Sequence, residues 1–498
     1  MGFKALLSLP LATSTVKNIK KWASKPKETQ QKVFESLIEG GKKTSFGKDH
    51  NFKEINSYQD FKSKVPLRTY EDLQPYINRV TQGEESVLWP GKPLYLAKTS
   101  GTTAGTKYIP ITKASIPNHI DSAKNALLSY IAETKDTSFV DGKMIFLQGS
   151  PILKKTAGIN TGRLSGIVAH HVPQYLQKNR MPSWETNCID DWEMKVSKIA
   201  EETSKHDMRL ISGIPAWVQM YFEVLLKQTG KKNIKEIFPN FSLFVYGGVN
   251  FGPYRAAFKK LIGSEIASVE TYPASEGFIA FQNSQKDDGL LMVLNKGIFY
   301  EFIPIDEVHN ENPTRLAIWE TELNQSYALV INNNAGLWGY LIGDVVKIVS
   351  LNPYKIRVVG RTKHFISAFG EHVIAEEVES TMEEVQSLFG CSVKEFHVAP
   401  QVSPEKGLPY HEWLIEFDVM PPNLDAFANK IDSLMQSKNI YYKDLLDGNI
   451  LRQVVITKIA PEGFTNFMKS RGKLGGQNKI PRLANDRSFA DLLQNFKL

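Results

Sequence analysis

Short apolar runs alternate with helical patterns through the middle of the chain. Four of these runs have the length and the apolar composition of buried strands. They are residues 94–97, 144–147, 243–246 and 266–269. Apolar residues at helical spacing lie between and after them, at residues 217–227 and 254–261. Alternation of strands and helices predicts an α/β fold, with β-sheets flanked by helices.

The pattern changes on both sides of this region. Roughly the first 90 residues favour helices, with Ser57 and Thr69 as N-caps before acidic first turns. A block rich in strands occupies residues 292–359. Beyond it, helix and strand patterns predict a compact α+β region. These patterns are the helices 375–388 and 423–435 and the strands 395–398, 413–419 and 453–456. We therefore expect a large N-terminal domain, residues 1–361, and a small mobile C-terminal domain, residues 362–498.

Composition narrows the class of protein. The 498 residues are 42% hydrophobic and 23% charged, which excludes a disordered or coiled-coil protein. A net charge of +7 over this length suits anionic small ligands such as nucleotides and does not demand nucleic acid; solvated lysines are the alternative explanation. Two distant cysteines favour a reducing compartment, and no apolar run approaches the ~18 residues of a membrane span. We expect a cytoplasmic protein, a monomer or weak homodimer, that binds small molecules and neither nucleic acid nor membranes.

The most specific feature is the stretch Thr99-Ser-Gly-Thr-Thr-Ala-Gly-Thr-Lys107, placed directly after a predicted strand. Its glycines free the backbone so that consecutive N–H groups can converge on an anion. The hydroxyls of Ser100, Thr102 and Thr103 add donors, and Lys107 adds a point charge suited to phosphate. Gly101 and Gly105 do not have the spacing of a Walker A loop. The stretch therefore predicts a phosphate-binding loop of another kind.

Three further stretches suggest nucleotide contacts, although each alone could be an ordinary turn. Thr271-Tyr-Pro-Ala-Ser-Glu-Gly277 follows a predicted strand, where open α/β sheets bind ligands. In it Tyr272 can stack on a purine and Glu276 can help to hold Mg²⁺. Tyr340-Leu-Ile-Gly-Asp344 places an acid after a glycine turn, where Asp344 can accept both hydroxyls of a ribose. Tyr246-Gly-Gly-Val249, with Gly247 and Gly248, could let an adenine lie against bare backbone.

Three of these motifs resemble, in chain order, the signature of adenylate-forming enzymes: the stretch 99–107, then Tyr272-Pro-Ala-Ser-Glu276, then Tyr340-Leu-Ile-Gly-Asp344. The spacing and the surroundings, including Lys107-Tyr-Ile-Pro110 and Ile214-Pro-Ala-Trp217, resemble the Gretchen Hagen family of acyl acid–amido synthetases. Plant members of that family conjugate hormone carboxylic acids to amino acids. One departure is Leu341, where plant members usually carry arginine; it argues against plant-like substrates and leaves the ribose role of Asp344 intact.

The resemblance implies a fold and a set of site residues. The fold is a large adenylate-forming domain followed by a small domain that rotates between half-reactions. The implied ligands are ATP and Mg²⁺. The phosphate contacts would be Thr99, Ser100, Gly101, Thr102, Thr103 and Lys107; the adenine and magnesium motif would be Tyr272, Ala274, Ser275 and Glu276, beside Gly247, Gly248 and Val249; and Asp344 and Arg361 would bind the ribose. Gln477-Asn-Lys479-Ile-Pro-Arg482 resembles the C-terminal segment whose lysine reaches the active site, which makes Lys479 catalytic together with Lys107 and Glu276.

The function expected from this resemblance is ATP-dependent formation of an acyl-adenylate, followed by transfer of the acyl group to the amine of an amino acid. Two alternatives stay open: transfer to coenzyme A, and a nucleotide-binding protein without catalysis. The acyl acid itself is not identified. The side chains of Val218, Tyr221, Phe222 and Leu225 could line an apolar pocket or could be the core of a helix.

Overall fold

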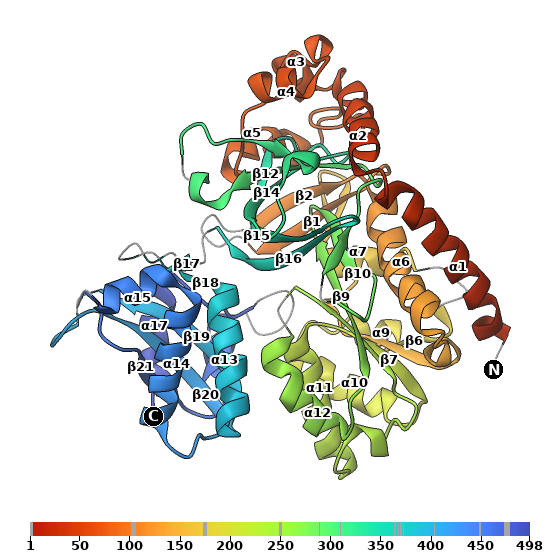
Figure 1. Cartoon of the computed structure of the whole chain (residues 1–498). Coiled ribbons are helices and arrows are strands. Elements are labelled where there is room, and N and C mark those ends of the chain that lie inside the picture. The colour runs from red at the N-terminus through yellow and green to blue at the C-terminus, as the bar shows by residue number, and fades with distance from the viewer. Residues whose placement is uncertain are drawn as a thin grey trace. The chain divides into compact units, whose positions relative to one another are not determined.

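The chain divides into two compact units in the computed structural model (Figure 1). The described residues are 3–498 without 101–105, 173–176, 249–250, 288, 309, 363–364, 367, 369–370, 372, 403, 448–449 and 473–478; the side chains of residues 3, 100, 106, 216, 253, 365, 440, 441 and 444 are not described either. The first unit comprises Met1–Val249, Leu261–Ile342 and Val346–Val358, and the second comprises Asn250–Lys260, Gly343–Val345 and Val359–Leu498. The domain boundary expected after residue 361, and the mobility of the smaller domain, stay predictions.

The helices expected at residues 217–227, 254–261, 375–388 and 423–435 are present in the structure. The α-helices are α1 (Phe3–Ala23), α2 (Pro26–Gly41), α3 (Ser45–Asp49), α4 (Tyr58–Lys64), α5 (Tyr70–Thr81), α6 (Ile116–Thr134), α7 (Leu164–Ala169), α9 (Trp184–Asn187), α10 (Trp192–Thr203), α11 (Pro215–Thr229), α12 (Arg255–Ile262), α13 (Ala375–Phe389), α14 (Leu424–Lys438), α15 (Ile440–Asp447), α16 (Gly463–Ser470) and α17 (Ser488–Leu493). Short 3₁₀ helices are η1 (Phe52–Glu54), η2 (Ser138–Asp141), η3 (Ile234–Glu236), η4 (Gly252–Tyr254), η5 (Ile305–Glu307), η6 (Ile318–Glu320) and η7 (Gln494–Phe496).

The N-terminal helices begin where their capping residues lie. Ser57 and Thr69 each accept a hydrogen bond from the backbone three residues on, and the acids Asp60 and Asp72 bond back to the cap. These reciprocal capping boxes satisfy N–H groups that the helix cannot pair internally. The predicted N-caps of α4 and α5 are therefore confirmed.

A twelve-stranded mixed sheet, among the described residues, dominates the first unit. Its order is β13-β12-β14-β15-β16-β11-β10-β9-β8-β7-β3-β6. The strands are β3 (Lys143–Phe146), β6 (Arg180–Met181), β7 (Met208–Ser212), β8 (Leu243–Gly247), β9 (Ala267–Ala274), β10 (Gly277–Gln282), β11 (Leu290–Met292), β12 (Ile298–Pro304), β13 (Leu316–Ala317), β14 (Ser326–Asn333), β15 (Tyr340–Leu351) and β16 (Tyr354–Arg361). From β6 to β9 neighbouring strands are parallel, and β10 then pairs antiparallel with β9. The carboxyl ends of β3, β7 and β8 therefore share one edge of the sheet.

The core of the first unit lies between the sheet and the helices that cover it. Helix α1 lies beside α6, and their apolar residues, among them Ala12 and Ile131, share a buried cluster with Phe278 of β10 (Figure 1). A separate four-stranded sheet has the order β2-β1-β5-β4. Its strands are β1 (Tyr95–Ser100), β2 (Thr106–Ile111), β4 (Lys154–Thr156) and β5 (Ile159–Gly162). Both sheets are flanked by helices, so the predicted α/β class is confirmed.

The second unit is a small α+β structure with helices on both faces of one sheet. Strands β19 (Ser392–Gln401), β20 (Tyr410–Val419) and β21 (Val455–Ile459) form this sheet, and β17 (Phe365–Ile366) pairs with β18 (Val373–Ile374). Side chains alternate along β20: Trp413 and Ile415 pack with α13 and α14, while Leu414 packs with α16 and α17. This alternation is what a strand buried on both faces requires. Strand β21 was expected at 453–456 and lies two to three residues further on.

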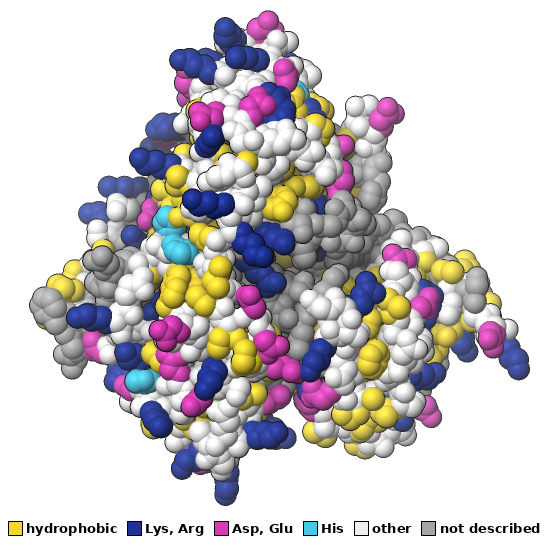
Figure 2. Space-filling view, turned by 180° about the vertical axis from the view of Figure 1, so that it is seen from behind, with side chains coloured by type: hydrophobic (Ala, Val, Ile, Leu, Met, Phe, Trp, Pro, Cys, Tyr) yellow, Lys and Arg dark blue, Asp and Glu magenta, His cyan; other side chains and the backbone are white. Residues whose placement is uncertain are grey.

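Acidic and basic side chains are interspersed on the face of the molecule shown in Figure 2. Among the residues that the structure describes, no helix combines the length and the apolar character needed to cross a membrane.

Candidate active site

The carboxyl end of β8 presents bare backbone beside β9. Gly247 pairs in parallel register with Thr271, and a Cβ built on Gly247 would lie 2.4 Å from the carbonyl oxygen of Thr271, so only glycine fits there. Gly248 has φ of +82° and is exposed. The Thr271 hydroxyl donates to the carbonyl of Tyr246 at 2.9 Å and ties the two strands together. A flat ring could approach this backbone closely. Val249 lies outside the described residues.

The stretch expected as a loop after residue 269 is instead a hairpin. Strand β9 continues through Tyr272 to Ala274 and pairs antiparallel with β10, so only Ser275 and Glu276 form the turn. The β-branched and aromatic residues at 269, 271 and 272 favour this extension. Tyr272 is buried in the main core of the unit, and Ser275 is buried as well.

Glu276 is held at the turn by two residues that the sequence did not indicate. The side-chain amide of Asn333, at the end of β14, donates to the backbone carbonyl of Glu276 at 2.7 Å. The hydroxyl of Tyr340, at the start of β15, donates to the Glu276 carboxylate over 3.5 Å. The buried side-chain amide of Asn333 thus holds the turn in place, and Glu276 itself stays half-exposed.

A magnesium ion fits this carboxylate as one ligand among several. No group of three or more acidic, histidine or cysteine side chains suited to a metal occurs in the described part of the chain. Mg²⁺ is commonly held by one or two carboxylates together with substrate phosphates and water, and does not need a cage made by the protein alone. Glu276 therefore has the chemistry to hold Mg²⁺ only when phosphates supply the remaining oxygens.

The phosphate-loop stretch is carried by a β-hairpin. Thr99 and Ser100 lie in β1 rather than in the loop, because this strand runs three residues beyond its predicted end. Thr99 pairs with Lys107 of β2. Gly101, Thr102 and Thr103 lie outside the described residues, and of Ser100 only the backbone is described.

Lys107 is oriented by the first turn of α5. Its ammonium lies 3.5 Å from the Glu71 carboxylate and 4.8 Å from the centre of the Tyr70 ring. The Tyr70 hydroxyl accepts a hydrogen bond from the backbone N–H of Tyr108 at 2.8 Å, which joins α5 to β2. Neither Tyr70 nor Glu71 was identified from the sequence. The only signal was the N-cap at Thr69, which predicted where α5 begins.

Asp344 and Arg361 form an ion pair within the second unit. The Arg361 Nε lies 3.0 Å from the Asp344 Oδ1, and the side chains are 48% and 16% exposed. The glycine expected to form a turn before Asp344 lies inside β15, where Gly343 has φ of +86°. The carbonyl of Gly343 accepts from the backbone N–H of Thr362 at 2.9 Å. Strand pairing and an arginine thus hold the acid in position, and part of its side chain stays exposed.

Lys479 belongs to the same electrostatic group. Desolvation lowers the pKa of Lys479 to about 8, although the residue as a whole is exposed. Asp344 acts to raise this pKa and Arg361 to lower it, so the three charges are close enough to affect one another. The structure thus brings Asp344, Arg361 and Lys479 together within one unit.

The segment after Lys479 is anchored to β19. The backbone carbonyl of Arg482 accepts from Val398 N–H at 2.9 Å, and the His397 ring donates to the Pro481 carbonyl at 2.7 Å. The Arg482 guanidinium pairs with Glu395 and donates to the Tyr254 hydroxyl at 2.8 Å. The sequence motif included Arg482 but gave it no role. It fixes the chain three residues beyond the candidate catalytic lysine.

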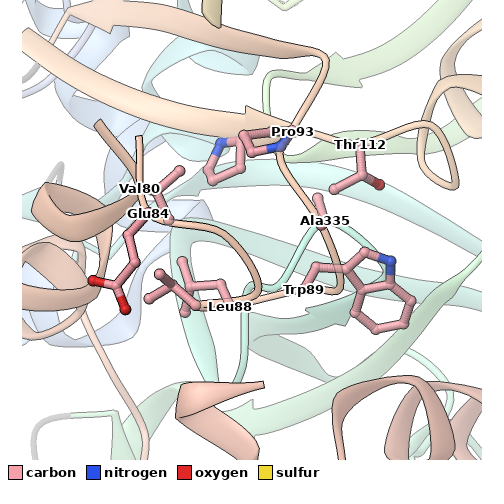
Figure 3. Close-up of a pocket in the computed structure, with 10 residues that line it drawn as sticks. Val80, Glu84, Leu88, Trp89, Pro93, Thr112 and Ala335 are labelled. Carbon is pink, nitrogen blue, oxygen red and sulfur yellow. The ribbon is translucent and has the colours of Figure 1, made fainter. Parts of the chain in front are cut away.

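The first unit has two other apolar regions of interest. A pocket in the first unit is lined mainly by apolar side chains, including Leu88 and Trp89 (Figure 3). Its one ionisable lining residue, Glu84, is paired with Arg79 at 2.8 Å. On α11, the four side chains considered for an acyl pocket are fully buried. They are Val218, Tyr221, Phe222 and Leu225.

Comparison with known proteins places these features in context. Models of the GH3 family N-terminal, central and C-terminal domains match residues 15–214, 291–361 and 376–488. Jasmonoyl--L-amino acid synthetase JAR4 of Nicotiana attenuata is 24% identical over 64% of this chain and 66% of its own. Indole-3-acetic acid-amido synthetase GH3.3 of Arabidopsis thaliana is 21% identical over 94% of this chain and 91% of its own. The solved structure of AtGH3.15 acyl acid amido synthetase in complex with 2,4-DB has a TM-score of 0.80 at 16% identity, covering 98% of this chain and 96% of that one.

Proposed function

Since this chain belongs to the GH3 family, we propose that it is an ATP-dependent acyl acid–amido synthetase. The observation that carries the proposal is the match of three consecutive family models, which together span most of the chain. One relative is named as an indole-3-acetic acid-amido synthetase and another as a jasmonoyl–L-amino acid synthetase. The arrangement of charged groups described above supports the same reaction.

The first half-reaction forms an acyl-adenylate. A carboxylate oxygen of the acyl acid attacks the α-phosphorus of ATP, and the bond to the bridging oxygen breaks, so that pyrophosphate leaves. The backbone at residues 99–103 and the Lys107 ammonium hold the phosphates. Asp344 accepts the ribose hydroxyls with Arg361 beside it, and Tyr272, Ala274 and Ser275 lie along the adenine together with Gly247, Gly248 and Val249. Lys479 stabilises the charge that builds up between the carboxylate and the α-phosphate.

Glu276 would hold Mg²⁺, which neutralises charge on the phosphates as they separate. In the second half-reaction the amine nitrogen of an amino acid attacks the acyl carbonyl, and AMP leaves. The amine loses a proton in this step. Positioning and charge neutralisation by these residues supply the catalysis, since the reaction requires no covalent bond to the protein.

The test measures both half-reactions on the purified protein. We expect exchange of labelled pyrophosphate into ATP that depends on a carboxylic acid, in a screen of aryl, indolyl and fatty acids. With the active acid, a second screen over amino acids should give an amide and AMP. Thioester formation with coenzyme A and no amide would contradict the proposal in favour of a CoA ligase. ATP binding without exchange for any acid would indicate a nucleotide-binding protein without catalysis.

A further inference from the structure

A group of buried cations lies where β3 ends in the first unit. Residues 147–150 follow this strand, and Arg163, Arg180 and Lys195 surround them from three different elements. Lys195 of α10 is 1% exposed, and burial lowers the pKa of both arginines. Asp190 is the one acid that acts on this group, and it is exposed. Burying positive charge without an acidic partner is costly, so the arrangement calls for an explanation.

Two of the three cations have partners within the protein. The Lys195 ammonium donates to the backbone carbonyls of Gln148 at 3.0 Å and Asn187 at 2.6 Å. Arg180 donates to the Ala169 carbonyl at 3.1 Å. In the orientation that satisfies its neighbours, the amide oxygen of Gln148 also accepts from Arg180. These cations therefore stabilise the loop after β3.

Arg163 differs from them. Its half-buried guanidinium makes no hydrogen bond or ion pair with the described residues, while its stem lies against the Gly149 backbone. A Cβ built on Gly149 would lie 2.9 Å from the Arg163 Cδ. The Ser165 hydroxyl lies near the same Gly149 position and has no hydrogen-bond partner in the described part of the chain. The side-chain oxygen of Asn187, whose carbonyl binds Lys195, has none either, and Asn187 is 1% exposed. The planar Arg163 guanidinium thus has N–H donors without partners among the described residues, near a hydroxyl that also lacks one.

This position lies within reach of the proposed adenylation site. Strand β7 separates β3 from β8, whose carboxyl end carries Gly247. Neighbouring strands are about 4.8 Å apart, so the end of β3 lies on the order of 10 Å from that glycine along the same edge. This is the distance scale of one substrate molecule. Arg163, whose stem lies against Gly149 just beyond β3, therefore lies at the same edge of the sheet as Gly247.

We propose that Arg163 binds the carboxylate of the amino acid acceptor in the second half-reaction. This inference rests on the proposed function. A planar guanidinium matches a carboxylate with two parallel hydrogen bonds. The acyl acid gives up its carboxylate charge when it is adenylated, whereas the amino acid keeps its carboxylate throughout and needs a lasting counter-charge. Arg163 therefore binds the carboxylate of the amino acid and not that of the acyl acid.

The experiment distinguishes binding of the amino acid carboxylate from binding of the acyl acid carboxylate. In Arg163→Gln we expect the KM for the amino acid to rise roughly 10- to 100-fold, the loss typical of a charged hydrogen bond, with pyrophosphate exchange for the acyl acid unchanged. The preference of the wild type for an amino acid over its carboxamide should disappear in the variant. A raised KM for the acyl acid in pyrophosphate exchange would instead assign Arg163 to the first carboxylate and overturn the proposal.

Two further variants control for folding. Gly149→Ala should displace the Arg163 side chain without removing its charge, and should weaken the preference for the carboxylate in the same direction. Arg209→Gln is the matched arginine control. Arg209 lies near the amino end of β7, away from the carboxyl ends of the strands, and pairs with Asp207 at 2.6 Å, so this variant should leave every KM unchanged. An active Arg163→Gln enzyme with an unchanged KM for the amino acid would contradict this inference alone. A wild-type enzyme that forms no amide would contradict the proposed function, and the inference with it.

Discussion

The charged side chains assigned to ATP already have partners in the protein. Lys107 lies against Glu71 and Tyr70, and Asp344 lies against Arg361. Such pairs hold long side chains in one orientation before a ligand binds, so less entropy is lost when phosphate or ribose arrives. Both pairs retain solvent-accessible surface, which lets a ligand compete for them.

Removing a charge at the phosphates should slow adenylation without unfolding the protein. We predict that Lys107→Ala and Glu276→Ala each raise the barrier to pyrophosphate exchange by about 3 kcal/mol, because each contacts charge that develops at the leaving group. Lys198→Ala, which removes an exposed lysine that pairs with Glu201 three residues on, is the control and should have no effect. Near-normal exchange in both test variants would remove these residues from the mechanism.

Lys479 should act in the first half-reaction only. We predict that Lys479→Ala slows adenylation about 100-fold and barely alters amide formation from acyl-adenylate supplied ready-made. Lys473, which lies outside the described residues, is the neighbouring lysine for comparison. If Lys473→Ala stops adenylation and Lys479→Ala does not, the assignment is wrong.

The same lysine predicts a pH dependence. Desolvation lowers its pKa from the ordinary 10.5 to about 8, so the ammonium loses its proton as the pH rises through 8. Because the charged form is the one that stabilises the transition state, kcat/KM for pyrophosphate exchange should fall above about pH 8, since this constant reports the free enzyme. Lys479→Arg keeps its charge and should shift this fall to higher pH. The same fall in both enzymes would assign it to another group.

Sequence reasoning found residues within motifs and missed those that support them from a distance. Glu276 lies in a recognisable stretch, but Asn333 and Tyr340 reach it from strands 57 and 64 residues further along the chain. Glu71 reaches Lys107 from a helix before the motif. Nothing in the local pattern of these supporting residues indicates which distant side chain they will meet, because the fold alone makes them neighbours.

At the scale of elements, periodicity identified the strands but not where they end. Strand β9 was expected to stop at residue 269 and continues to Ala274, and Gly343 lies within β15 instead of in a turn. In both places glycine or proline suggested a break. Pairing with β10 in the first case and with β16 in the second overrides that local preference, since backbone groups of a strand gain partners from the whole sheet.

Helix capping was predicted more accurately, because it depends on a few adjacent residues. The box formed by Thr69 and Asp72 fixes the start of α5, and α5 in turn carries Tyr70 and Glu71 to Lys107. We predict that Thr69→Ala lowers the free energy of unfolding by about 1 kcal/mol, as measured by denaturant titration. Thr69→Ser keeps the hydroxyl and should retain nearly full stability. Equal losses in the two variants would show that the methyl group matters rather than the cap.

At the scale of the whole molecule, contacts between residues divide the chain into two units whose segments alternate along the sequence. Residues Asn250–Lys260 and Gly343–Val345 belong with the C-terminal unit, through contacts such as that between Tyr254 and Arg482. These contacts join residues 228 positions apart, and no composition shift marks them. A pattern along the chain does not show which earlier segments pack with a later one.

The proposed rotation of the C-terminal domain leads to the last prediction. Asp344, Arg361 and Lys479 form one electrostatic group that adenylation would use, and amide formation would require the lysine to give way to the amine. A hinge absorbs such a change in a few backbone dihedrals, and proline fixes φ near −65°. We therefore predict that Lys363→Pro, at a residue outside the described set, impairs one half-reaction several-fold more than the other. Lys363→Ala removes the same charge but leaves the backbone free, and should affect neither. Equal losses in pyrophosphate exchange and in amide formation from ready-made acyl-adenylate would indicate an enzyme whose two units stay fixed throughout the reaction.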